Sequence, residues 1–370
     1  MVKKVLVYTD AKSVSGIGRF VAALLDVLVE AGHQAACAQV PEDNPLTASL
    51  RTKGVRYFPL PIDADKDRPA FINDRKTPAT TFDAAEPDVI LFANGHPLST
   101  INAVAIAAGR RIPYIIREGL VGVAVLAQTA EQQRVVRHNY DRARAVVCDC
   151  RDGLTMLSHN YKLPAGFGRV IPSGASDAFF ATRNEARRRT FRAAWGAFPD
   201  TLVCFTSAKL EPVKGHAVQL AALPLLKNDR LMVWPGDGRL RQSILDHPNA
   251  DRIRLLGHVW NLDELLDGAD IFVLTSFHEG TPYALVEAMA KGLPIIATKA
   301  GGIPEALGDC GILLPWPQDV EATGRLLAGE INRLAADPAE RKRLGEAARK
   351  RAEAHFTASQ ELARYLELLA

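Results

Sequence analysis

Two glutamates, Glu279 and Glu287, flank the predicted start of a short helix. Thr281 is the predicted N-cap and Pro282 the first helical residue, where the missing proline N–H removes no helical hydrogen bond. The first turn of a helix offers free N–H groups and the positive end of the helix dipole, which together favour a phosphate. Gly280 has no Cβ, so a ligand can come close to the backbone there. Carboxylates accept hydrogen bonds from sugar hydroxyls, so the pattern is typical of a sugar-nucleotide site.

The apolar pattern predicts the elements that hold these residues. The run at 271–274 predicts a strand buried on both faces, as in a parallel sheet, and the run at 294–298 predicts a second one. Between Pro282 and Gly292, apolar residues recur at helical spacing and predict an amphipathic helix. Helical side chains lean toward the N-terminus of their helix, so we expect Glu287 to point toward the end of the helix where a phosphate would bind. The alternative is a capped surface helix with solvated glutamates.

This stretch of sequence resembles a known family. The matching residues are Glu279-Gly280, Pro282, Glu287-Ala288-Met289-Ala290, Gly292, Pro294 and Gly301-Gly302-Ile303-Pro304-Glu305. Together they resemble the signature of the family-4 retaining glycosyltransferases, which have the GT-B fold. The resemblance implies that Glu287 holds the ribose hydroxyls of the donor nucleotide and that Glu279 contacts the transferred sugar. It also implies that the backbone of Gly280, Thr281, Pro282, Tyr283 and Leu285 meets the diphosphate.

A second stretch of the resemblance follows the strand predicted at 202–206. Lys209 and Lys214-Gly215 match the family's basic loop, where an Arg or Lys and a later Lys-Gly pair grip the diphosphate. Lys209 stands where relatives commonly have arginine, so the charge is kept but the planar two-pronged grip is lost. Cations here would neutralise charge on the departing nucleoside diphosphate. The alternative is a pair of lysines exposed to solvent.

Two more contacts with the donor are implied by the resemblance. The backbone near Val259, after a strand predicted at 253–256, would face the nucleotide base. Uracil and guanine both stay open, and we favour a UDP-sugar over a GDP-sugar. Gly16 and Gly18 resemble the family's first loop, where the backbone approaches the donor phosphate. They are not a dinucleotide fingerprint, because Val21 replaces the third glycine, and such a pair is as often a plain tight turn.

The acceptor side departs most from the family pattern. Relatives often carry a histidine after the strand predicted at 113–116, where this chain has Arg117 and Glu118. We expect these two residues to line the acceptor side. His96, after the strand at 88–92, is the candidate for a comparable role, with a loop histidine bonded to backbone as the alternative. The candidate catalytic residues are Glu279, Lys214, Lys209 and His96.

Strand and helix patterns alternate in both halves of the 370-residue chain, which predicts an α/β protein with two doubly wound, Rossmann-like domains. In the GT-B fold such domains face each other across a cleft, and a C-terminal helix crosses back to the first. The predicted parts are an acceptor-side domain at 1–178, a linker at 179–200, a sugar-nucleotide-binding domain at 201–354 and a returning helix at 355–370. Residues 41–81 are polar and interrupted by prolines, which predicts an exposed loop with a short strand near 55–58.

The composition narrows the class of protein. The formal net charge of +3 is too mild to indicate nucleic-acid binding, and 48% hydrophobic with 24% charged residues is ordinary for a soluble globular protein. No apolar run approaches the roughly 20 residues that span a bilayer. Five scattered cysteines, and no secretory signal before the first strand, lead us to expect a cytoplasmic protein. A basic helix predicted at 131–143 could make peripheral contact with an anionic lipid or an acidic acceptor, but such a face is more often simply solvated.

No Asp-x-Asp pair precedes the donor loop, so we expect a reaction that needs no metal ion and no cofactor. The predicted function is a retaining, metal-independent hexosyltransferase that uses a sugar nucleotide as co-substrate and an unidentified acceptor. Two alternatives stay open. One is a sugar-nucleotide epimerase or hydrolase of the same fold, and the other is a non-catalytic protein that binds a sugar nucleotide.

Overall fold

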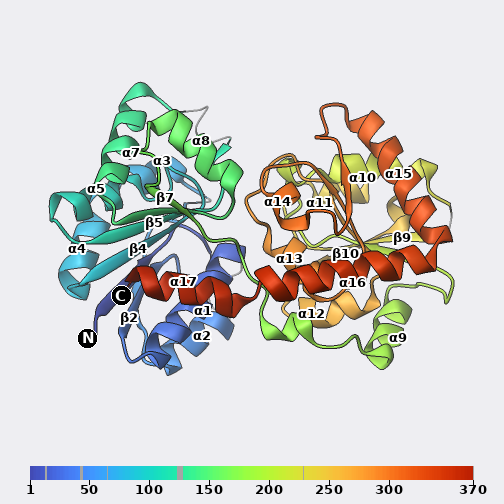
Figure 1. Ribbon diagram of the computed structural model, residues 1–370, viewed down its shortest axis with the longest axis horizontal. Coiled ribbons are helices and arrows are strands. Elements are labelled where there is room, and N and C mark those ends of the chain that lie inside the picture. The colour runs from blue at the N-terminus through green and yellow to red at the C-terminus, as the bar shows by residue number, and fades with distance from the viewer. Residues whose placement is uncertain (13–14, 42–44, 65, 123–127, 228, 370) are drawn as a thin grey trace. The chain divides into compact units, whose positions relative to one another are not determined.

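The chain forms two compact units, each built on a parallel β-sheet (Figure 1). The computed structural model describes every residue except 13–14, 42–44, 65, 123–127, 228 and 370. Unit 1 consists of Met1–Pro172 and Glu361–Ala370, and unit 2 consists of Ser173–Gln360. Residues 179–200, predicted as a linker, are therefore grouped with unit 2.

Unit 1 is organised by a sheet of strand order β3-β2-β1-β4-β5-β6-β7, with parallel pairing throughout. Its strands are β1 (Lys4–Tyr8), β2 (Gln34–Gln39), β3 (Arg56–Pro59), β4 (Val89–Asn94), β5 (Tyr114–Glu118), β6 (Ala145–Cys148) and β7 (Gly168–Val170). The order changes direction between β1 and β4, and the carboxyl ends flanking such a switch point are where open α/β sheets bind ligands.

The helices of unit 1 correct one prediction. They are α1 (Gly16–Glu30), α2 (Pro45–Thr52), α3 (Arg68–Asn73), α4 (Lys76–Ala85), α5 (Ile101–Gly109), α7 (Ala130–Arg142), α8 (Arg151–Tyr161) and α17 (Ala358–Leu369). The exposed loop predicted at 41–81 was wrong outside β3, because α2, α3 and part of α4 occupy that stretch. The prediction was wrong because it took the prolines as signs of a loop. Pro45 and Pro69 stand in the first turns of helices, where proline is tolerated.

Unit 2 has a sheet of strand order β10-β9-β8-β11-β12-β13, again parallel. Its strands are β8 (Leu202–Phe205), β9 (Arg230–Pro235), β10 (Ile253–Gly257), β11 (Ile271–Leu274), β12 (Ile295–Thr298) and β13 (Ile312–Leu314). Its α-helices are α9 (Glu185–Ala194), α10 (His216–Ala222), α11 (Arg241–Leu245), α12 (Leu262–Leu265), α13 (Tyr283–Ala290), α14 (Ile303–Leu307), α15 (Val320–Ala336) and α16 (Pro338–His355). Short 3-10 turns are η1 (Asp177–Phe180), η2 (Pro212–Lys214), η3 (Leu223–Leu225), η4 (Ala250–Arg252) and η5 (Leu266–Gly268).

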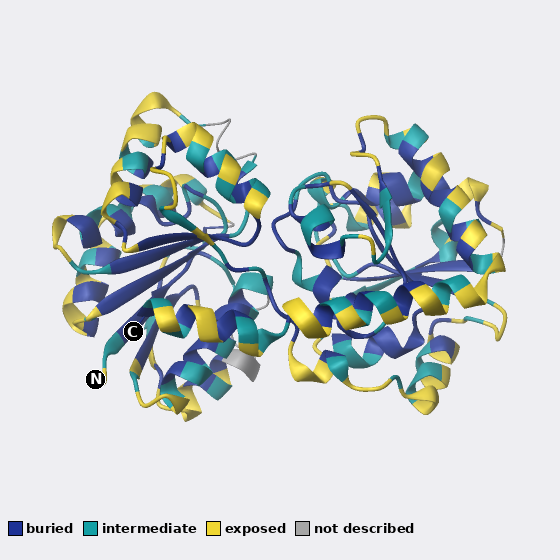
Figure 2. Cartoon of the chain, viewed as in Figure 1, coloured by how far each residue is buried: buried dark blue, intermediate teal, exposed yellow. Residues whose placement is uncertain are grey.

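The central strands of each unit are buried, the edge strands β3, β7 and β10 are partly exposed, and the outer faces of the helices carry exposed residues (Figure 2). Strand β8 is apolar throughout because both of its faces are covered. Val203 and Phe205 point into one hydrophobic cluster, and Leu202 and Cys204 point into another on the opposite face. A strand covered on both faces reads as a continuous apolar run, so the strands predicted for unit 2 are confirmed.

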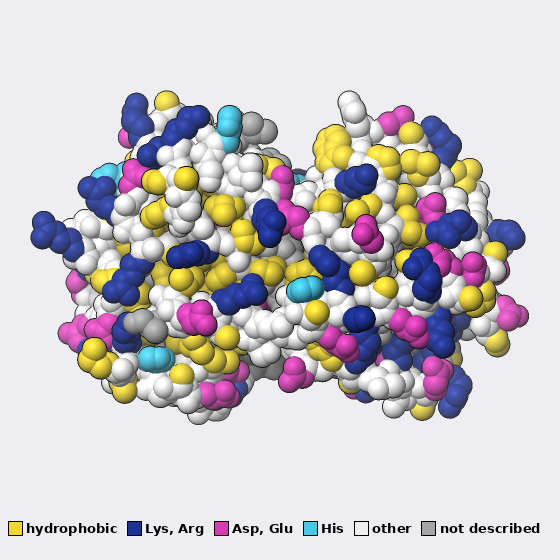
Figure 3. All heavy atoms as spheres, viewed as in Figure 1, with side chains coloured by type: hydrophobic (Ala, Val, Ile, Leu, Met, Phe, Trp, Pro, Cys, Tyr) yellow, Lys and Arg dark blue, Asp and Glu magenta, His cyan; other side chains and the backbone are white. Residues whose placement is uncertain are grey.

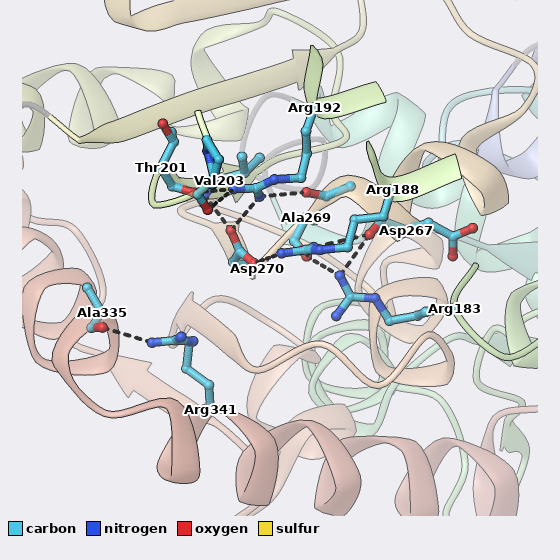
Figure 4. Close-up of polar contacts among 12 residues, drawn as sticks. Arg183, Arg188, Arg192, Thr201, Val203, Asp267, Ala269, Asp270, Ala335 and Arg341 are labelled. Atoms are coloured by element: carbon cyan, nitrogen blue, oxygen red, sulfur yellow. Dashed lines mark hydrogen bonds and ion pairs between the residues drawn. The ribbon is translucent and has the colours of Figure 1, made fainter. Parts of the chain in front are cut away.

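Helix α9 is rich in arginine, and its Arg188 and Arg192 point toward Asp270 (Figure 4). Arg188 and Arg192 bond to Asp270 at 2.5 and 2.8 Å, and Arg187 pairs with Asp267 at 2.8 Å. These contacts fix α9 to the segment that precedes β11. The basic character of α9 therefore has a structural explanation within unit 2.

The two chain segments that connect the units bond to each other. The Ala175 N–H donates to the carbonyl of Phe356, and the Ala358 N–H donates to the carbonyl of Ala175, both at 2.8 Å. A Cβ placed on Gly174 would lie 2.3 Å from the carbonyl oxygen of Thr357. The backbones therefore approach so closely that only glycine fits at this position.

Helix α17 packs within unit 1, as predicted for the returning C-terminal helix. The rings of Tyr365 and Phe20 have centroids 4.8 Å apart, and Tyr365 is fully buried. The Lys3 ammonium donates to the carbonyl of Leu369 at 3.1 Å. A helix with one apolar face thus covers the start of α1.

Among the described residues, no helix is both long and apolar enough to cross a lipid bilayer. The face in Figure 3 carries Lys and Arg interspersed with Asp and Glu, in keeping with the small net charge of +3. The helix predicted at 131–143 is confirmed as α7, which Thr129 and Gln132 close with a capping box. Its Arg137 pairs with Asp141 at 2.9 Å, as on a solvated helix face.

Candidate functional site

The candidate donor site of unit 2 is formed by loops after β8, β11 and β12. These strands are neighbours in the sheet and run parallel, so their carboxyl ends lie at one edge. The loop after β8 carries Lys209 and Lys214, and the loop after β11 carries Glu279. The structure thus brings together two loops that are about 65 residues apart in sequence.

Gly215 fixes the loop that carries Lys214. Its φ is +68°, and an added Cβ would lie 1.8 Å from the carbonyl oxygen of Thr275. The Thr275 hydroxyl donates to the carbonyl of Gly215 at 2.9 Å, and the Phe277 N–H donates to the carbonyl of Val213 at 2.8 Å. The Lys-Gly pair therefore has a physical reason: only glycine lets the two loops touch.

Gly301 performs the same role on the other side of Glu279. It has φ of +52°, and an added Cβ would lie 1.9 Å from the Glu279 carbonyl oxygen. The Gly302 N–H donates to that carbonyl at 3.3 Å, and the Thr298 hydroxyl donates to the carbonyl of Ser276 at 2.6 Å. The Gly-Gly pair of the sequence signature thus holds the backbone of Glu279 in place.

Lys214 and Glu279 form an ion pair at the centre of these loops. The Lys214 ammonium lies 2.6 Å from Glu279 Oε1, and the Ser276 hydroxyl donates to the same oxygen at 2.7 Å. The side chain of Glu279 is 6% exposed and that of Lys214 is 21% exposed. The pair is therefore mostly buried, yet the lysine keeps some access to solvent, where a ligand can reach it.

Lys209 lies on a different part of the same loop and is exposed. Its neighbours are fixed by glycines of the loop after β9: a Cβ on Gly236 would lie 1.9 Å from the Ala208 carbonyl oxygen, and one on Gly238 would lie 2.6 Å from that of Leu210. The backbone that presents Lys209 is consequently rigid, while its side chain extends into solvent.

Helix α13 differs from its prediction at the N-terminus. It begins at Tyr283 with Pro282 as the N-cap, so the assignment of Thr281 as N-cap and Pro282 as first helical residue was wrong by one position. Proline has no side-chain acceptor, and α13 therefore has no side-chain cap to its first turn. Gly292 follows the helix with φ of +74°, as predicted.

Burial also corrects the prediction of an amphipathic helix, because every residue from Leu285 to Ala290 is buried. Glu287 is included in this stretch and is only 3% exposed, which excludes the alternative of a solvated surface glutamate. Gly280 and Thr281 are buried as well, whereas Pro282 and Tyr283 are partly exposed. The start of α13 therefore presents backbone N–H groups beside the Lys214–Glu279 pair.

Other predicted donor contacts lie at separate strand ends. Val259 follows the edge strand β10 and packs against the apolar cluster of unit 2. Gly16 and Gly18 belong to unit 1, where they form the first turn of α1 instead of a loop before it. The Ser15 hydroxyl accepts the Gly18 N–H at 3.0 Å, so that N–H already has a partner. Contact of any of these residues with a donor stays a prediction.

His96 lies at the switch point of unit 1, in the turn after β4. Its Nδ1 accepts the Leu98 N–H at 3.2 Å, which is the backbone contact expected of a loop histidine. Burial lowers the pKa of His96, and nearby Arg68 lowers it further, while Asp10 opposes this. Asp10 pairs with Arg68 at 2.6 Å and accepts the Gly95 N–H at 3.4 Å. His96 is thus held neutral near neutral pH, and its catalytic role stays a prediction.

Arg117 and Glu118 were expected in a loop that lines the acceptor side; the structure corrects the loop, and their contact with an acceptor stays a prediction. They are the last two residues of β5, not a loop, and both side chains are 1% exposed. Arg117 pairs with Asp149 at 2.8 Å and lies over the ring of Phe20. The contacts with Asp149 and Phe20 explain why Arg117 is buried inside unit 1.

Glu118 points to the opposite face of the sheet. Its Oε1 accepts hydrogen bonds from Asn94 at 3.1 Å and from the Tyr140 hydroxyl at 2.9 Å. Burial raises the pKa of Glu118 to about 8, although both hydrogen bonds act in the other direction. The carboxyl group of Glu118 is therefore mainly protonated at neutral pH. It is buried in unit 1 and is not an exposed group.

Sequence reasoning missed the hydroxyl residues that build the donor site. The Thr206 hydroxyl donates to Gln219 at 3.0 Å, Gln219 donates to Thr275 at 3.1 Å, and Thr275 bonds to Gly215. Ser276 contacts Glu279 directly. The sequence did offer a signal: Thr206 follows the apolar run of β8, and Thr275 and Ser276 follow that of β11. The carboxyl ends of these two parallel strands lie at the same edge of the sheet.

Within the part of the chain that the structure describes, no three His, Cys, Asp or Glu side chains gather as metal ligands would. The residues of the donor site supply cations and N–H groups instead, a set suited to an anion. His216, directly after Gly215, is buried, and burial and nearby Lys214 lower its pKa to about 4. It therefore stays neutral beside Lys214.

Comparison with protein families matches both halves of the chain. Residues 187–351 match the family described as "Glycosyl transferases group 1", and residues 15–174 match the "Glycosyl transferase 4-like domain". Similar curated proteins include the D-inositol 3-phosphate glycosyltransferase of Streptomyces bingchenggensis, 32% identical over 186 residues, which are 45% of this chain and 40% of that protein. Another is the MMP alpha-(1->4)-mannosyltransferase of Mycolicibacterium hassiacum, 27% identical over 74% of this chain and 64% of that protein. The matched stretches thus span between about two fifths and two thirds of these relatives.

Solved structures share the fold over nearly the whole chain. The HepE protein of Anabaena, in complex with UDP and glucose, matches with a TM-score of 0.81 and 19% identity, covering 99% of each chain. The sucrose-phosphate synthase of Thermosynechococcus elongatus matches with a TM-score of 0.80 and 18% identity, covering 99% of this chain and 98% of that one. The chain therefore shares the fold of these proteins, and with its two parallel sheets it has the GT-B fold.

Proposed function

The chain belongs to the group 1 glycosyltransferases, and on that premise we propose that it transfers a hexose-type sugar from a nucleoside-diphosphate donor to an acceptor hydroxyl, with retention of the anomeric configuration. Unit 2 would hold the donor and unit 1 the acceptor. The single observation that carries the proposal is the Lys214–Glu279 pair, at 2.6 Å, beside the uncapped start of α13. Cation, carboxylate and helix N-terminus are the three groups that a diphosphate joined to a sugar requires.

In the proposed reaction the bond from the anomeric carbon to the diphosphate oxygen breaks, and its electron pair leaves with the diphosphate. Lys214, Lys209 and the N–H groups of α13 stabilise that negative charge as it develops. The acceptor oxygen bonds to the same face of the anomeric carbon, and its proton passes to the departing diphosphate. Glu279 would bind a hydroxyl of the transferred sugar, and buried Glu287 would bind the ribose hydroxyls.

A donor screen tests this proposal. UDP-glucose is the first donor to test, because HepE, which shares the fold, was solved with UDP and glucose; GDP- and ADP-sugars follow. A donor at 100 times its Kd should stabilise the protein by about 2.7 kcal/mol, seen as a higher Tm. Product analysis without acceptor separates transfer from epimerisation and hydrolysis, because an epimerase or hydrolase converts the donor at full rate alone. No binding of any sugar nucleotide by folded protein would contradict the proposal.

The finer features are tested in the same assay. Retention predicts that the new glycosidic bond has the anomeric configuration of the donor, read by NMR. Independence from metals predicts that a chelator leaves the rate unchanged. We also propose a cytoplasmic location, which is supported by the scattered spacing of the five cysteines in the sequence. An acceptor screen with the matched donor, read by mass, addresses the acceptor.

A further inference from the structure

Beside the Lys214–Glu279 pair stands an exposed aromatic residue that the proposed mechanism does not use. Trp316 follows β13 and is 51% exposed, although tryptophan is a residue that folding usually covers. Its indole N–H donates to the carbonyl of Phe277 at 2.9 Å. The two rings meet edge to face, with centroids 6.1 Å apart and planes at 81°. The polar end of the indole is therefore bonded, while its apolar surface is half open to solvent.

The backbone holds this ring in one place. Trp316 lies between Pro315 and Pro317, and proline restricts both its own φ and the conformation of the residue before it. Phe277, the partner of the indole, is itself fixed by the bond from its N–H to the carbonyl of Val213. A ring that is already immobilised loses little conformational entropy when a ligand covers it.

The ring also stands close to the proposed sugar-binding residue. Phe277 precedes Glu279 by two positions, so their Cα atoms are at most about 7 Å apart. Strand β13 neighbours β12 on the side of the sheet away from β9 and β10. Trp316 therefore lies on the Glu279 side of the site, whereas Val259, the predicted neighbour of the nucleotide base, follows β10.

We propose that Trp316, buttressed by Phe277, is a stacking platform for a saccharide ring next to Glu279. One face of a pyranose carries several C–H groups, and such a face packs well on an indole, while the hydroxyls around the ring remain free for hydrogen bonds. The inference rests on the proposed function. The ring is that of a sugar bound at this edge of unit 2, either the transferred sugar of the donor or a sugar of the acceptor.

The test compares wild type with Trp316→Ala, Trp316→Phe and a control. Phe198→Ala is the matched control, because Phe198 is an exposed aromatic residue of unit 2, 78% exposed, that lies before β8 and hence at the opposite edge of the sheet. For each variant we would measure Kd for UDP and for the UDP-sugar by calorimetry, and then KM for donor and acceptor.

We expect Trp316→Ala to weaken binding of the sugar-bearing substrate about tenfold, a size that one lost aromatic contact can reach. Binding of UDP alone should stay unchanged, Trp316→Phe should lose less, and Phe198→Ala should match wild type. A higher Kd for the UDP-sugar assigns the platform to the transferred sugar, and a higher acceptor KM alone assigns it to the acceptor.

Two results would overturn the platform. In one, UDP and UDP-sugar weaken equally, which would show that Trp316 acts only through the fold of the site. In the other, neither donor nor acceptor constants change in the Trp316→Ala variant. Failure of the proposed function is recognised separately, because wild type would then neither bind nor convert any sugar nucleotide. If Trp316→Ala does not fold, the smaller loss expected for Trp316→Phe decides the question.

Discussion

The carboxyl edges of the two sheets use charged residues in opposite ways. In unit 2, Lys214 and Glu279 are paired at an edge where the lysine is still 21% exposed. In unit 1, Arg117 and Asp149 are paired with side chains only 1% and 7% exposed. Both ion pairs involve residues that follow a strand or end one, yet the first is partly open to solvent and the second is closed off inside unit 1. Access to solvent, more than residue type, therefore separates a candidate site from a structural pair.

The largest expected effect comes from breaking the pair of unit 2. Lys214→Met removes the cation that would face the diphosphate, so kcat should fall about 10²- to 10³-fold, as when one preorganised charge-stabilising donor is lost. Steady-state kinetics with the matched donor would measure this. Lys209→Met, at the exposed lysine, is the comparison and should cost only about tenfold. An equal fall in kcat for the two variants would contradict the expectation that the partly buried lysine matters more than the exposed one.

Breaking the pair of unit 1 should act on stability instead. Arg117→Met leaves Asp149 buried without the guanidinium, so the free energy of unfolding should fall by about 3 to 5 kcal/mol. Urea unfolding followed by circular dichroism would show this, and donor binding by the folded variant should remain as in wild type. Unchanged stability of the Arg117→Met variant would contradict the structural role given to this pair.

Glycines at the candidate donor site should tolerate substitution by alanine less well than a glycine with open space around it. Gly215→Ala places a Cβ 1.8 Å from the Thr275 carbonyl oxygen, whereas at Gly32, which also has positive φ, nothing lies within 4 Å of an added Cβ. We expect Gly32→Ala to cost about 1 kcal/mol of stability for its backbone conformation alone. Gly215→Ala should cost about 1 to 3 kcal/mol more, with weaker donor binding. Similar Tm values for the two variants would contradict the close approach of the loops.

The last expected effect is seen only as the pH changes, and it is a pH dependence of stability at Glu118. Its pKa is raised to about 8 in the folded chain from an ordinary value of 4.5, so the folded state binds the proton more tightly than the unfolded state. Stability contributed by this group is therefore present below about pH 4.5 and is lost as the pH rises toward about 8. Glu118→Gln does not titrate, so across that window its free energy of unfolding should gain on wild type by about 1.4 kcal/mol per pH unit. Parallel pH profiles for the two proteins would contradict the raised pKa.

Part of the candidate donor site of unit 2 could be predicted because several of its residues are close together in sequence, although their contact with a donor stays a prediction. Glu279, Gly280 and Glu287 lie within one β-α-β unit, and buried parallel strands are continuous apolar runs that a sequence displays plainly. Alternation of strands and helices likewise gave the two sheets and the helix that returns to unit 1. Two details of α13 were wrong: its start, where Pro282 and not Thr281 is the N-cap, and its amphipathic pattern, since Leu285 to Ala290 are all buried.

The rest could not be predicted because it depends on partners distant in sequence. Nothing in the sequence near Arg117 and Glu118 shows that Asp149 and Tyr140 bury them from two faces of a sheet. The close approaches at Gly215 and Gly301 are likewise visible only once two loops meet. Prolines in 41–81 indicated a loop, since a sequence does not show which prolines begin a helix.

Binding of a sugar nucleotide to wild type and to the Lys214→Met variant, measured by calorimetry, tests the central claim most directly. A matched control is Lys12→Met, which removes a lysine paired with Asp63 at 3.0 Å in unit 1. The account predicts that wild type and the control bind the same UDP- or GDP-sugar with equal affinity, and that Lys214→Met binds it at least about tenfold more weakly. Equal affinity of all three proteins for the donor would contradict the assignment of the site.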